Sequence, residues 1–412
     1  MLTSSFLSTL VLALVVAANP VVVRDNNLLR IPFSKKINVT EPAHIVKQDQ
    51  ARAAALRAHG LAKAAGRLQK DAVVSVGVQN QAVSYVATVA VGSPATDFSL
   101  LIDTGSSNTW VGAGKAFKKT STSVQTKDKV AVQYGSGSFS GTEFTDTVSL
   151  GTGLSIKAQS IGVASKSEGF EGVDGILGIG PTDLTLDTLS PDTNSDIPTV
   201  TDNLFTQGLI SAHEVAVSFE PTTSEADNNG ELTFGGTDSS KFTGSISFTP
   251  LTTTSPANEF WGINESIRFG TSTNILSETA GIVDTGTTLV LLASNAFSAY
   301  QKATGGVMDE ETGLLRLTTA QFEKLESLFF DINGVEFELT ANAQAWPRNL
   351  NADIGGNANS VYLIVNDLGT PSGEGLDFIN GFTFLERFYS VFDTANSRVG
   401  FATTPFTDAT SN

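Results

Sequence analysis

The sequence predicts an all-β body built from two similar lobes, preceded by a helical N-terminal leader. Composition is the first reason, because short runs rich in Val, Ile and Phe alternate with Gly, Ser and Thr, and only 16% of the residues are charged. Such segments are typical of strands joined by turns. The second reason is an Asp-Thr-Gly triplet that occurs at residues 103–105 and again at 284–286, each time after an apolar run. This repeat indicates that one β-lobe has been duplicated.

Residues 1–18 have the pattern of a cleaved signal peptide. Leu10–Val16 is continuously apolar, and Val16-Ala17-Ala18 supplies the small residues that signal peptidase requires. A membrane anchor is the alternative, but the run is shorter than the ~20 residues of a bilayer span. No later stretch is long and apolar enough to span. We therefore expect a secreted, extracellular protein whose mature form has no membrane segment.

Charge divides the chain into a basic leader and an acidic body. Residues 19–71 carry ten basic and four acidic residues, a net charge of +6, whereas residues 72–412 carry 15 basic and 38 acidic residues, a net charge of −23. A basic leader on an acidic body predicts an intramolecular electrostatic cover that fails once carboxylates are protonated. A solvated basic linker is the alternative. The acidic body would repel phosphate, so a nucleic-acid partner is not expected.

The leader also has its own secondary-structure signal. Ala, Leu, Lys, Arg and Gln dominate residues 43–70 and are good helix formers, whereas the sequence after Val73 alternates strand-like runs and turns. We therefore predict four segments: a signal peptide at 1–18, a basic propeptide at 19–71, a first β-lobe at 72–249 and a second β-lobe at 250–412. We expect the body to be a monomer.

The inventory of reactive side chains excludes several hydrolase classes. The chain has no cysteine, so neither disulfides nor thiolate chemistry is possible. His213 is the only histidine after residue 71. A Ser-His-Asp site and a His-based zinc site are therefore not expected, and we predict no metal.

The two triplets are parts of longer matched segments. Leu100–Ser107 reads LLIDTGSS and Gly281–Thr288 reads GIVDTGTT. A single Asp-Thr-Gly would be ordinary turn chemistry. A second matched pair, Val173–Gly178 and Leu376–Gly381, follows them, so the repeat extends over whole lobes. Duplicated lobes would bring one Asp from each half to a cleft on a pseudo-twofold axis.

Six sequence blocks, taken in order, resemble the pepsin-like aspartic proteases. They are Asp103–Trp110, Tyr134–Ser138, Gly172–Gly180, Phe260–Ile263, Asp284–Thr288, and Phe388–Asp393 leading to Val399–Ala402. The resemblance implies a bilobal fold made as a zymogen, with Asp103 and Asp284 as catalytic acids, polypeptide substrates and no cofactor. In aspartic proteases generally, two carboxyls about 3 Å apart share one proton. One can then accept a proton from a water while the other protonates the substrate carbonyl. We expect an acid pH optimum.

Residues next to each catalytic acid are candidates for orienting it. Gly105 and Gly286 allow the backbone to approach closely, so that amide N–H groups can bond the carboxylates. Ser106 and Thr287 supply hydroxyls that can donate to the outer oxygens. Ordinary turn chemistry is the alternative for both hydroxyls.

A hairpin rich in Gly and Ser follows the first acid. Tyr134, with Gly135 and Ser136, resembles the flap of the family, whose tyrosine covers the substrate and meets a tryptophan, here Trp110. Gly-containing loops can bend, and closure would exclude bulk water from the acids. A phosphate-binding loop is the alternative, but the glycine spacing fits no dinucleotide or kinase pattern and no lysine follows.

The resemblance also suggests the residues that line the substrate pocket. Leu101, Phe170 and Ile176, together with Tyr134, are candidates, and an apolar cleft would favour large hydrophobic side chains at the cleavage site. Each could instead be plain core. Phe260 and Trp261 are expected to belong to the core of the second lobe.

The leader and two sequons carry further expectations. Family members place a leader lysine on the catalytic acids, and Lys63 and Lys70 are the candidates here. Asn38-Val39-Thr40 and Asn264-Glu265-Ser266 are N-glycosylation sequons, of which only Asn264 would persist after processing.

The chain departs from the family pattern at Asn380-Gly381-Phe382, where many relatives carry Leu-Gly-Asp, beside the second catalytic loop. This change could alter packing or the environment of the local carboxylate. The alternative function is a pepsin-fold protein that has lost catalysis and serves as a binding protein or inhibitor. Such proteins usually have a damaged triplet or flap, and both are intact here.

Overall fold

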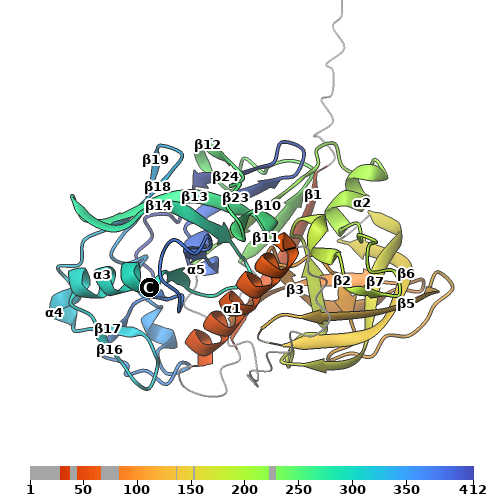
Figure 1. Cartoon of the computed structure of the whole chain (residues 1–412), viewed down its shortest axis with the longest axis horizontal. Helices are drawn as coiled ribbons and strands as arrows, with labels where there is room; N and C mark the ends of the chain where they lie inside the picture. Colours follow the sequence, from red (N-terminus) through yellow and green to blue (C-terminus); the bar gives the residue numbers. More distant parts are fainter. Residues whose placement is uncertain (1–27, 38–43, 66–82, 136, 152–153, 222–228) are drawn as a thin grey trace, which may run out of the picture.

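The computed structural model describes residues 28–37, 44–65, 83–135, 137–151, 154–221 and 229–412. The predicted signal peptide at 1–18, Lys70 and the predicted cleavage region near residue 71 lie outside these ranges. The described chain is mostly β-structure in two halves, and one long helix crosses the molecule between them (Figure 1). The predicted all-β, bilobal fold is therefore confirmed. No helix in the described part has the length and apolar character needed to cross a membrane.

The largest sheet has 14 strands, in the order β12-β24-β23-β10-β11-β1-β2-β3-β8-β4-β7-β6-β5-β9, with β2 also pairing with β6. Its strands are β1 (Leu29–Ile37), β2 (Val83–Val91), β3 (Thr96–Asp103), β4 (Trp110–Val111), β5 (Val124–Gln133), β6 (Ser138–Leu150), β7 (Ser155–Glu168), β8 (Gly175–Gly178), β9 (Leu189–Ser190), β10 (Glu214–Phe219), β11 (Gly230–Phe234), β12 (Thr243–Pro250), β23 (Phe388–Asp393) and β24 (Arg398–Thr403). The predicted lobe boundary at Thr249 falls within β12, and the division at that residue stays a prediction.

A seven-stranded sheet, in the order β19-β18-β13-β14-β22-β15-β21, and a three-stranded sheet, in the order β16-β17-β20, complete the β-structure of the second half. The seven strands are β13 (Gly262–Phe269), β14 (Thr273–Val283), β15 (Val290–Leu292), β18 (Leu328–Ile332), β19 (Val335–Leu339), β21 (Val365–Asp367) and β22 (Phe378–Asn380). The three are β16 (Val307–Met308), β17 (Leu315–Leu317) and β20 (Val361–Tyr362).

Helices are few and, apart from the first, short. They are α1 (His44–Ala64), α2 (Val200–Thr206), α3 (Ser294–Thr304), α4 (Thr319–Phe322) and α5 (Phe382–Leu385), with 3-10 turns at Thr182–Thr185, Ala257–Glu259 and Arg348–Leu350. Helix α1 lies within the predicted helical segment 43–70. Its last turn carries Lys63, which suits the negative end of the helix dipole.

The duplicated sequence segments occupy equivalent places in the two halves. Strand β3 ends at Asp103 and pairs in parallel with β8, which lies within Val173–Gly178. Strand β14 ends one residue before Asp284 and pairs in parallel with β22, which lies within Leu376–Gly381. In each half the partner strand also pairs antiparallel with the short strand that follows the triplet, β4 or β15. The repeat seen in the sequence is thus a repeat of strand pairing.

The prediction for the leader was incomplete. Residues 19–71 contain a strand as well as the expected helix. Strand β1 lies between β11 and β2 inside the 14-stranded sheet. Leu29, Ile31 and Phe33 are buried at alternate positions, as a strand with one face in the core requires. The alternation continues to Lys35, whose side chain is buried with 1% exposure.

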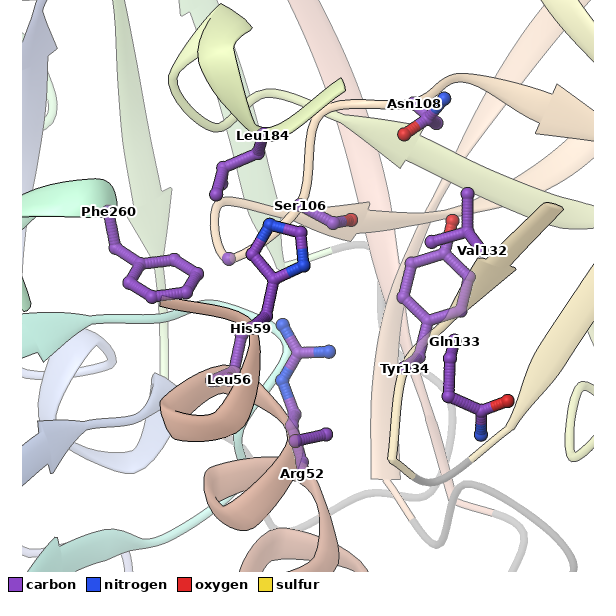
Figure 2. A pocket seen from close by; sticks show the side chains of 12 residues that line it. Arg52, Leu56, His59, Ser106, Asn108, Val132, Gln133, Tyr134, Leu184 and Phe260 are labelled. Carbon is purple, nitrogen blue, oxygen red and sulfur yellow. The ribbon is translucent and has the colours of Figure 1, made fainter. Parts of the chain in front are cut away.

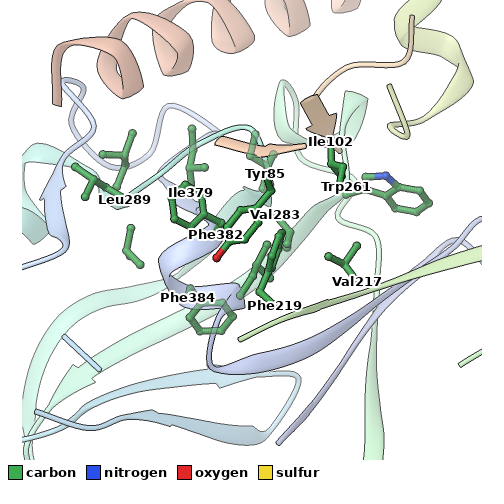
Figure 3. Close-up of a cluster of buried hydrophobic side chains, with 14 of the residues drawn as sticks. Tyr85, Ile102, Val217, Phe219, Trp261, Val283, Leu289, Ile379, Phe382 and Phe384 are labelled. Atoms are coloured by element: carbon green, nitrogen blue, oxygen red, sulfur yellow. The ribbon is translucent and has the colours of Figure 1, made fainter. Parts of the chain in front are cut away.

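One large apolar core joins the two halves beneath the triplets. Ile102 of β3 and Val283 of β14 belong to the same cluster of buried side chains, which also contains Phe219, Trp261 and Phe382 (Figure 3). Both strands that lead to an Asp-Thr-Gly triplet are therefore held by shared packing. The chain has no cysteine, so this core is not reinforced by disulfides.

The buried Lys35 is paired with the core of the body. Its Nζ lies 2.8 Å from Glu386 Oε1, and the Tyr85 hydroxyl donates to the same oxygen at 2.5 Å. The side chains of Lys35 and Glu386 are 1% and 4% exposed. A buried pair of this kind is costly to break, since removing one partner leaves the other charge uncompensated.

We expect Lys35→Met to destabilise the full chain by about 3–5 kcal/mol, because the Glu386 carboxylate would stay buried without its cation. Urea unfolding at neutral pH measures the effect. The double variant Lys35→Met, Glu386→Gln should recover much of the loss, since a neutral amide oxygen can still accept from Tyr85. An unchanged unfolding midpoint for Lys35→Met would contradict the role of this pair.

Candidate active site

The two aspartates of the triplets are fully buried, and each is oriented by its own loop. Gly105 N–H donates to Asp103 Oδ1 at 2.9 Å and Ser106 Oγ donates to Asp103 Oδ2 at 2.5 Å. The second loop matches the first, as the repeat predicts. Gly286 N–H donates to Asp284 Oδ1 at 3.0 Å and Thr287 Oγ1 donates to Asp284 Oδ2 at 2.6 Å.

The threonines in the middle of the triplets bond the two loops together. Thr104 N–H donates to Thr285 Oγ1 at 3.0 Å, and Thr285 N–H donates to Thr104 Oγ1 at 2.9 Å. Each hydroxyl in turn donates to a backbone carbonyl of the opposite strand, Val283 or Ile102. Sequence reasoning missed this role, although the presence of threonine in both triplets was the signal.

These contacts bring the two carboxyl groups face to face. A Cβ atom built on Gly105 would lie 2.6 Å from Asp284 Oδ1, and one built on Gly286 would lie 2.7 Å from Asp103 Oδ1. Such distances are too short for real carbon–oxygen contacts, so only glycine fits beside the opposite carboxylate. Each triplet glycine therefore has two functions: its N–H binds one aspartate, and its missing side chain admits the other.

A guanidinium from the leader occupies the space between the carboxylates. Arg52 of α1 places Nη2 2.5 Å from Asp103 Oδ1 and 2.9 Å from Asp284 Oδ1, with Nε 2.7 Å from Asp284 Oδ2. Its side chain is 3% exposed. Figure 2 shows Arg52 pointing from the helix toward the loop that carries Ser106. The planar fork of arginine suits such multiple contacts.

The charges in this cluster shift one another's protonation. Burial disfavours the charged guanidinium, but Asp103 and Asp284 outweigh burial and raise the pKa of Arg52 above its usual value. Burial also raises the pKa of Asp103, against the opposing effect of Arg52. For Asp284, burial is outweighed by Arg52 and by bonds from Thr287 and Gly286, so its pKa is lowered. Arg52 thus stabilises ionised Asp284.

The predicted lysine contact is wrong where the structure tests it. Lys63 lies near the end of α1, and its Nζ pairs with Glu259 at 2.9 Å and Asp183 at 3.7 Å, away from the aspartates. Lys70 lies outside the described residues. Arg52 was missed because the sequence does not distinguish it from the other nine basic residues of the leader, and because the resemblance to the aspartic protease family suggested a lysine.

A second leader residue binds the loop after the second triplet. Asp49, one helical turn before Arg52, accepts N–H bonds from Thr288 at 3.1 Å and from Leu289 at 2.7 Å. It is 3% exposed. Burial raises its pKa to about 7, although the two N–H bonds work in the opposite direction.

The flap residues pack over the first loop. Trp110 stacks on Phe139 with ring centroids 4.2 Å apart, and Tyr134 meets Phe170 edge-on at 5.5 Å. Gly135 lies against α1, beside Ala51 and Ala55. Ser136 lies outside the described residues.

The expected contact between Tyr134 and Trp110 is looser than a standard hydrogen bond. Among the described residues neither the Tyr134 hydroxyl nor the Trp110 indole N–H has a partner of standard geometry. Burial raises the pKa of Tyr134 well above its usual value, and Trp110 lowers it only in part. The hydroxyl is therefore kept protonated.

A pocket remains between α1, the flap and the second half. Its lining includes Leu56, His59, Tyr134, Leu184 and Phe260 (Figure 2). Phe260 belongs to the buried core, as expected, and it also forms one wall of this pocket. Of the predicted pocket residues, only Tyr134 lines it.

Leu101, Phe170 and Ile176 instead share a buried cluster with Tyr134 and Trp110. Their contact with substrate stays a prediction. Asn264, the predicted glycosylation site, is exposed on β13. Within the described part of the chain, no group of three or more His, Asp or Glu residues could hold a metal ion.

Comparison with known proteins extends this picture. Residues 84–404 match the family model for eukaryotic aspartyl protease. The chain is 71% identical to polyporopepsin from Irpex lacteus over 338 residues, which is 82% of this chain and 99% of that protein. It is 32% identical to cathepsin E from Rattus norvegicus over 341 residues (78% of this chain, 80% of that protein) and 30% identical to pepsin A from Sus scrofa over 345 residues (77% and 80%).

A solved structure has the same fold. The crystal structure of aspartic proteinase from Irpex lacteus superposes with a TM-score of 0.80 at 62% identity, covering 93% of this chain and all of that one. The resemblance inferred from the six sequence blocks is confirmed.

The contact between Asp49 and the loop after the second triplet makes the docking of α1 depend on pH near neutrality. Its pKa is raised to about 7 in the docked helix, above its usual value of 3.8, so the docked state binds the proton more tightly. Docking is therefore weakened as the pH rises from about 4 to about 7. Hydrogen exchange of the α1 amides, corrected for intrinsic rates and measured on samples whose leader is intact by mass spectrometry, should show less protection at pH 8 than at pH 5. Asp49→Asn should remove most of this difference, and an equal difference in the variant would contradict the assignment.

Proposed function

Because the chain belongs to the eukaryotic aspartyl protease family and is an aspartic-type endopeptidase, we propose that Asp103 and Asp284 are its catalytic acids and that the chain is made as an inactive zymogen. The reaction is hydrolysis of internal peptide bonds of proteins at acid pH. The observation that carries the proposal is the Arg52 guanidinium bound between two facing, fully buried aspartates.

Catalysis requires that Arg52 leave the two carboxyl groups, so that a water can lie between them. Two facing carboxyls cannot both ionise easily, so in the uncovered enzyme one is charged and one is neutral, as is general for aspartic proteases. The charged carboxylate takes a proton from a water, whose oxygen attacks the peptide carbonyl carbon. The neutral carboxyl gives its proton to the carbonyl oxygen, which yields a gem-diol without a covalent enzyme intermediate. Collapse of the gem-diol, with protonation of the leaving amine, separates the two products.

Ser106 and Thr287 support this reaction by fixing the outer oxygens of the acids, and Gly105 and Gly286 by fixing the inner ones. The carboxyls are then already oriented before the substrate binds. Because the two acids interact strongly, the apparent pKa values of the uncovered enzyme belong to the pair and not to either residue.

The leader acts as an intramolecular inhibitor in two ways. Arg52 neutralises the charge that must accept the proton from water, and α1 lies along the cleft in front of the flap. Acidification has two successive effects on this cover. Protonation of Asp49 strengthens docking as the pH falls from about 7 to about 4, and protonation of Asp284, whose pKa is lowered, weakens the cover below that range. The contribution of Asp284 to docking is present above the usual aspartate range and is lost as the pH falls through the lowered value. The body, whose net charge is −23, also loses negative charge in this range, which weakens its attraction for the basic leader.

The remaining features follow from the leader and the cleft. Removal of residues 1–18 and then 19–71 would release a monomeric, extracellular enzyme that comprises residues 72–412. Leu101, Tyr134, Phe170 and Ile176 form an apolar group under the flap, which supports a preference for large hydrophobic residues at the cleavage site. Exposure of Asn264 supports its glycosylation.

We expect the purified precursor, brought to acid pH, to lose its leader and to cleave an unfolded protein, with activity falling toward neutral pH. Asp103→Asn should lower the cleavage rate by at least about a hundredfold, because proton transfer through the pair is lost. Self-processing should fail in the same variant. A rate constant measured on a peptide substrate, with and without a statine-type transition-state analogue, gives the comparison.

Cleavage that persists in Asp103→Asn would overturn the catalytic assignment. A folded, processed wild-type body with no cleavage at any acid pH would instead indicate a binding protein of the same fold. Activity of the precursor with its leader intact would contradict the zymogen proposal alone.

A further inference from the structure

A buried carboxyl group that the reaction does not use lies close to the second catalytic loop. Glu265 is on β13 and is 1% exposed, and Asn380 is the last residue of β22 and is 0% exposed. Both strands pair with β14, whose end leads directly to Asp284. Asn380 Nδ2 donates to Glu265 Oε2 at 2.8 Å. Asn380 also belongs to the segment Asn380-Gly381-Phe382, which was singled out as unusual in the sequence analysis.

The backbone of Asn380 holds the second catalytic aspartate. Asp284 N–H donates to the Asn380 carbonyl oxygen at 3.1 Å, and Asn380 pairs in register with Val283 on one side and with Val290 on the other. A shift of Asn380 therefore moves the backbone from which the Asp284 carboxylate projects.

The pair is incomplete if Glu265 is ionised. Besides the one bond between them, the other side-chain oxygens, Glu265 Oε1 and Asn380 Oδ1, are buried and have no hydrogen-bond partner among the described residues. Both are acceptors, so neither can satisfy the other. An unsatisfied buried acceptor costs about 1–3 kcal/mol, and more when it is charged.

If Glu265 is protonated, both of these unsatisfied oxygen atoms can take part in a hydrogen bond. A protonated carboxyl has one O–H donor, and an amide oxygen is a good acceptor. If Oε1 carries the proton, its O–H can donate to Asn380 Oδ1, while Asn380 Nδ2 already donates to Oε2. The two side chains then form a ring of two hydrogen bonds with no atom left unpaired.

Among the described residues, no charged group shifts the protonation of Glu265. The acidic residues on or beside the elements packed against β13 and β22 include Glu278 of β14, Asp331 of β18, Glu259 of the 3-10 turn, and Asp284 and Asp377 at the strand ends. Two arginines are also near: Arg268 lies on β13 itself, and Arg387 follows α5, which packs against β22. None of these charged groups is a cause of the pKa shift of Glu265. Burial raises the pKa of Glu265 to about 8, and the Asn380 bond opposes this only in part.

We propose that Glu265 and Asn380 are positioning residues for Asp284, joined as a protonated-acid–amide pair that holds the end of β22 in place. The proposal rests on the proposed function only in taking Asp284 as a catalytic acid. Both hydrogen bonds of the pair can form at every pH at which Glu265 is neutral, which includes the whole acid range. Ionisation of Glu265 breaks one of its two bonds and leaves a buried carboxylate without a cation.

The sign of the pH effect follows from the protonation. Glu265 binds its proton more tightly in the folded protein than in the unfolded chain, whose value is near 4.5. Its contribution to stability is fully present below about pH 4.5 and is lost progressively as the pH rises to about 8. The pair is therefore suited to an enzyme that works in acid.

Glu265→Gln provides the matched test, because a glutamine amide can donate to Asn380 Oδ1 and accept from its Nδ2 at every pH. Glu265→Met has similar size and removes the ring. We expect Glu265→Met to lower kcat by about tenfold with a smaller change in KM, since a misplaced Asp284 affects the chemical step more than binding. Glu265→Gln should restore most of that loss.

The stability readout does not depend on activity. It uses an Asp103→Asn background, which should block self-processing. We expect the thermal midpoint of the intact precursor to fall more steeply between pH 5 and pH 8 when Glu265 is kept than when the Glu265→Gln substitution is added. An infrared difference spectrum at pH 6, between the proteins with and without Glu265→Gln, should show a protonated carboxyl band from Glu265, because the contribution of Asp49 is common to both and cancels.

Equal pH slopes for the two proteins, or no such band, would overturn the protonated pair even if Glu265→Met does not fold. Equal kcat values for Glu265→Met and wild type would overturn the positioning role. Loss of cleavage in wild type would instead count against the proposed function and leave the stability result intact.

Discussion

The contact on which the rest of the structure depends is one guanidinium between two carboxyl groups. Arg52, Asp103 and Asp284 are all nearly or fully excluded from water, and burying any one of these charges alone would be very costly. The guanidinium offsets the carboxylate charge, and the loop amides and hydroxyls bond the carboxyl oxygens further. A guanidinium fits because it presents several N–H groups in one plane, whereas the compact ammonium of a lysine would not span both acids in the same way.

The rest of the leader places this arginine and keeps it there. Strand β1 is part of the largest sheet and is fixed by the Lys35–Glu386 pair. Helix α1 is held by Asp49 on the backbone of the second loop and by Lys63 on Glu259. Each contact joins the leader to the acidic body at a different point, so the excess of basic residues is used as particular ion pairs rather than as a diffuse field. The same triplet glycines that admit the opposite carboxylate also leave room for the arginine.

Much of this arrangement could be predicted from the sequence, and the failures have physical reasons. The duplicated triplets predicted two equivalent loops, because strand pairing repeats wherever the segment repeats. The helix composition predicted α1. Strand β1 was missed even though Leu29, Ile31 and Phe33 alternate with other residues, because the buried Lys35 made the segment look like part of a basic tail. Arg52 could not be distinguished from its neighbours, since only the docked helix determines which basic side chain reaches the acids. Asn380 was recognised as unusual, but its partner Glu265 is distant in sequence and appeared only as the middle residue of a sequon.

The most direct test of this account is the affinity of a statine-type analogue for the intact precursor, measured by calorimetry at a pH where the processed enzyme binds it. The account predicts no detectable binding to the wild-type precursor. Arg52→Ala should raise the apparent affinity at least about a hundredfold, because loss of a buried ion-pair partner costs several kcal/mol of docking and increases the open fraction. Arg57→Ala, which removes an arginine of the same helix that pairs with Glu374 near the surface, is the control and should leave binding undetectable. Equal affinities for the two variants, or tight binding to the wild-type precursor, would show that Arg52 does not cover the aspartates.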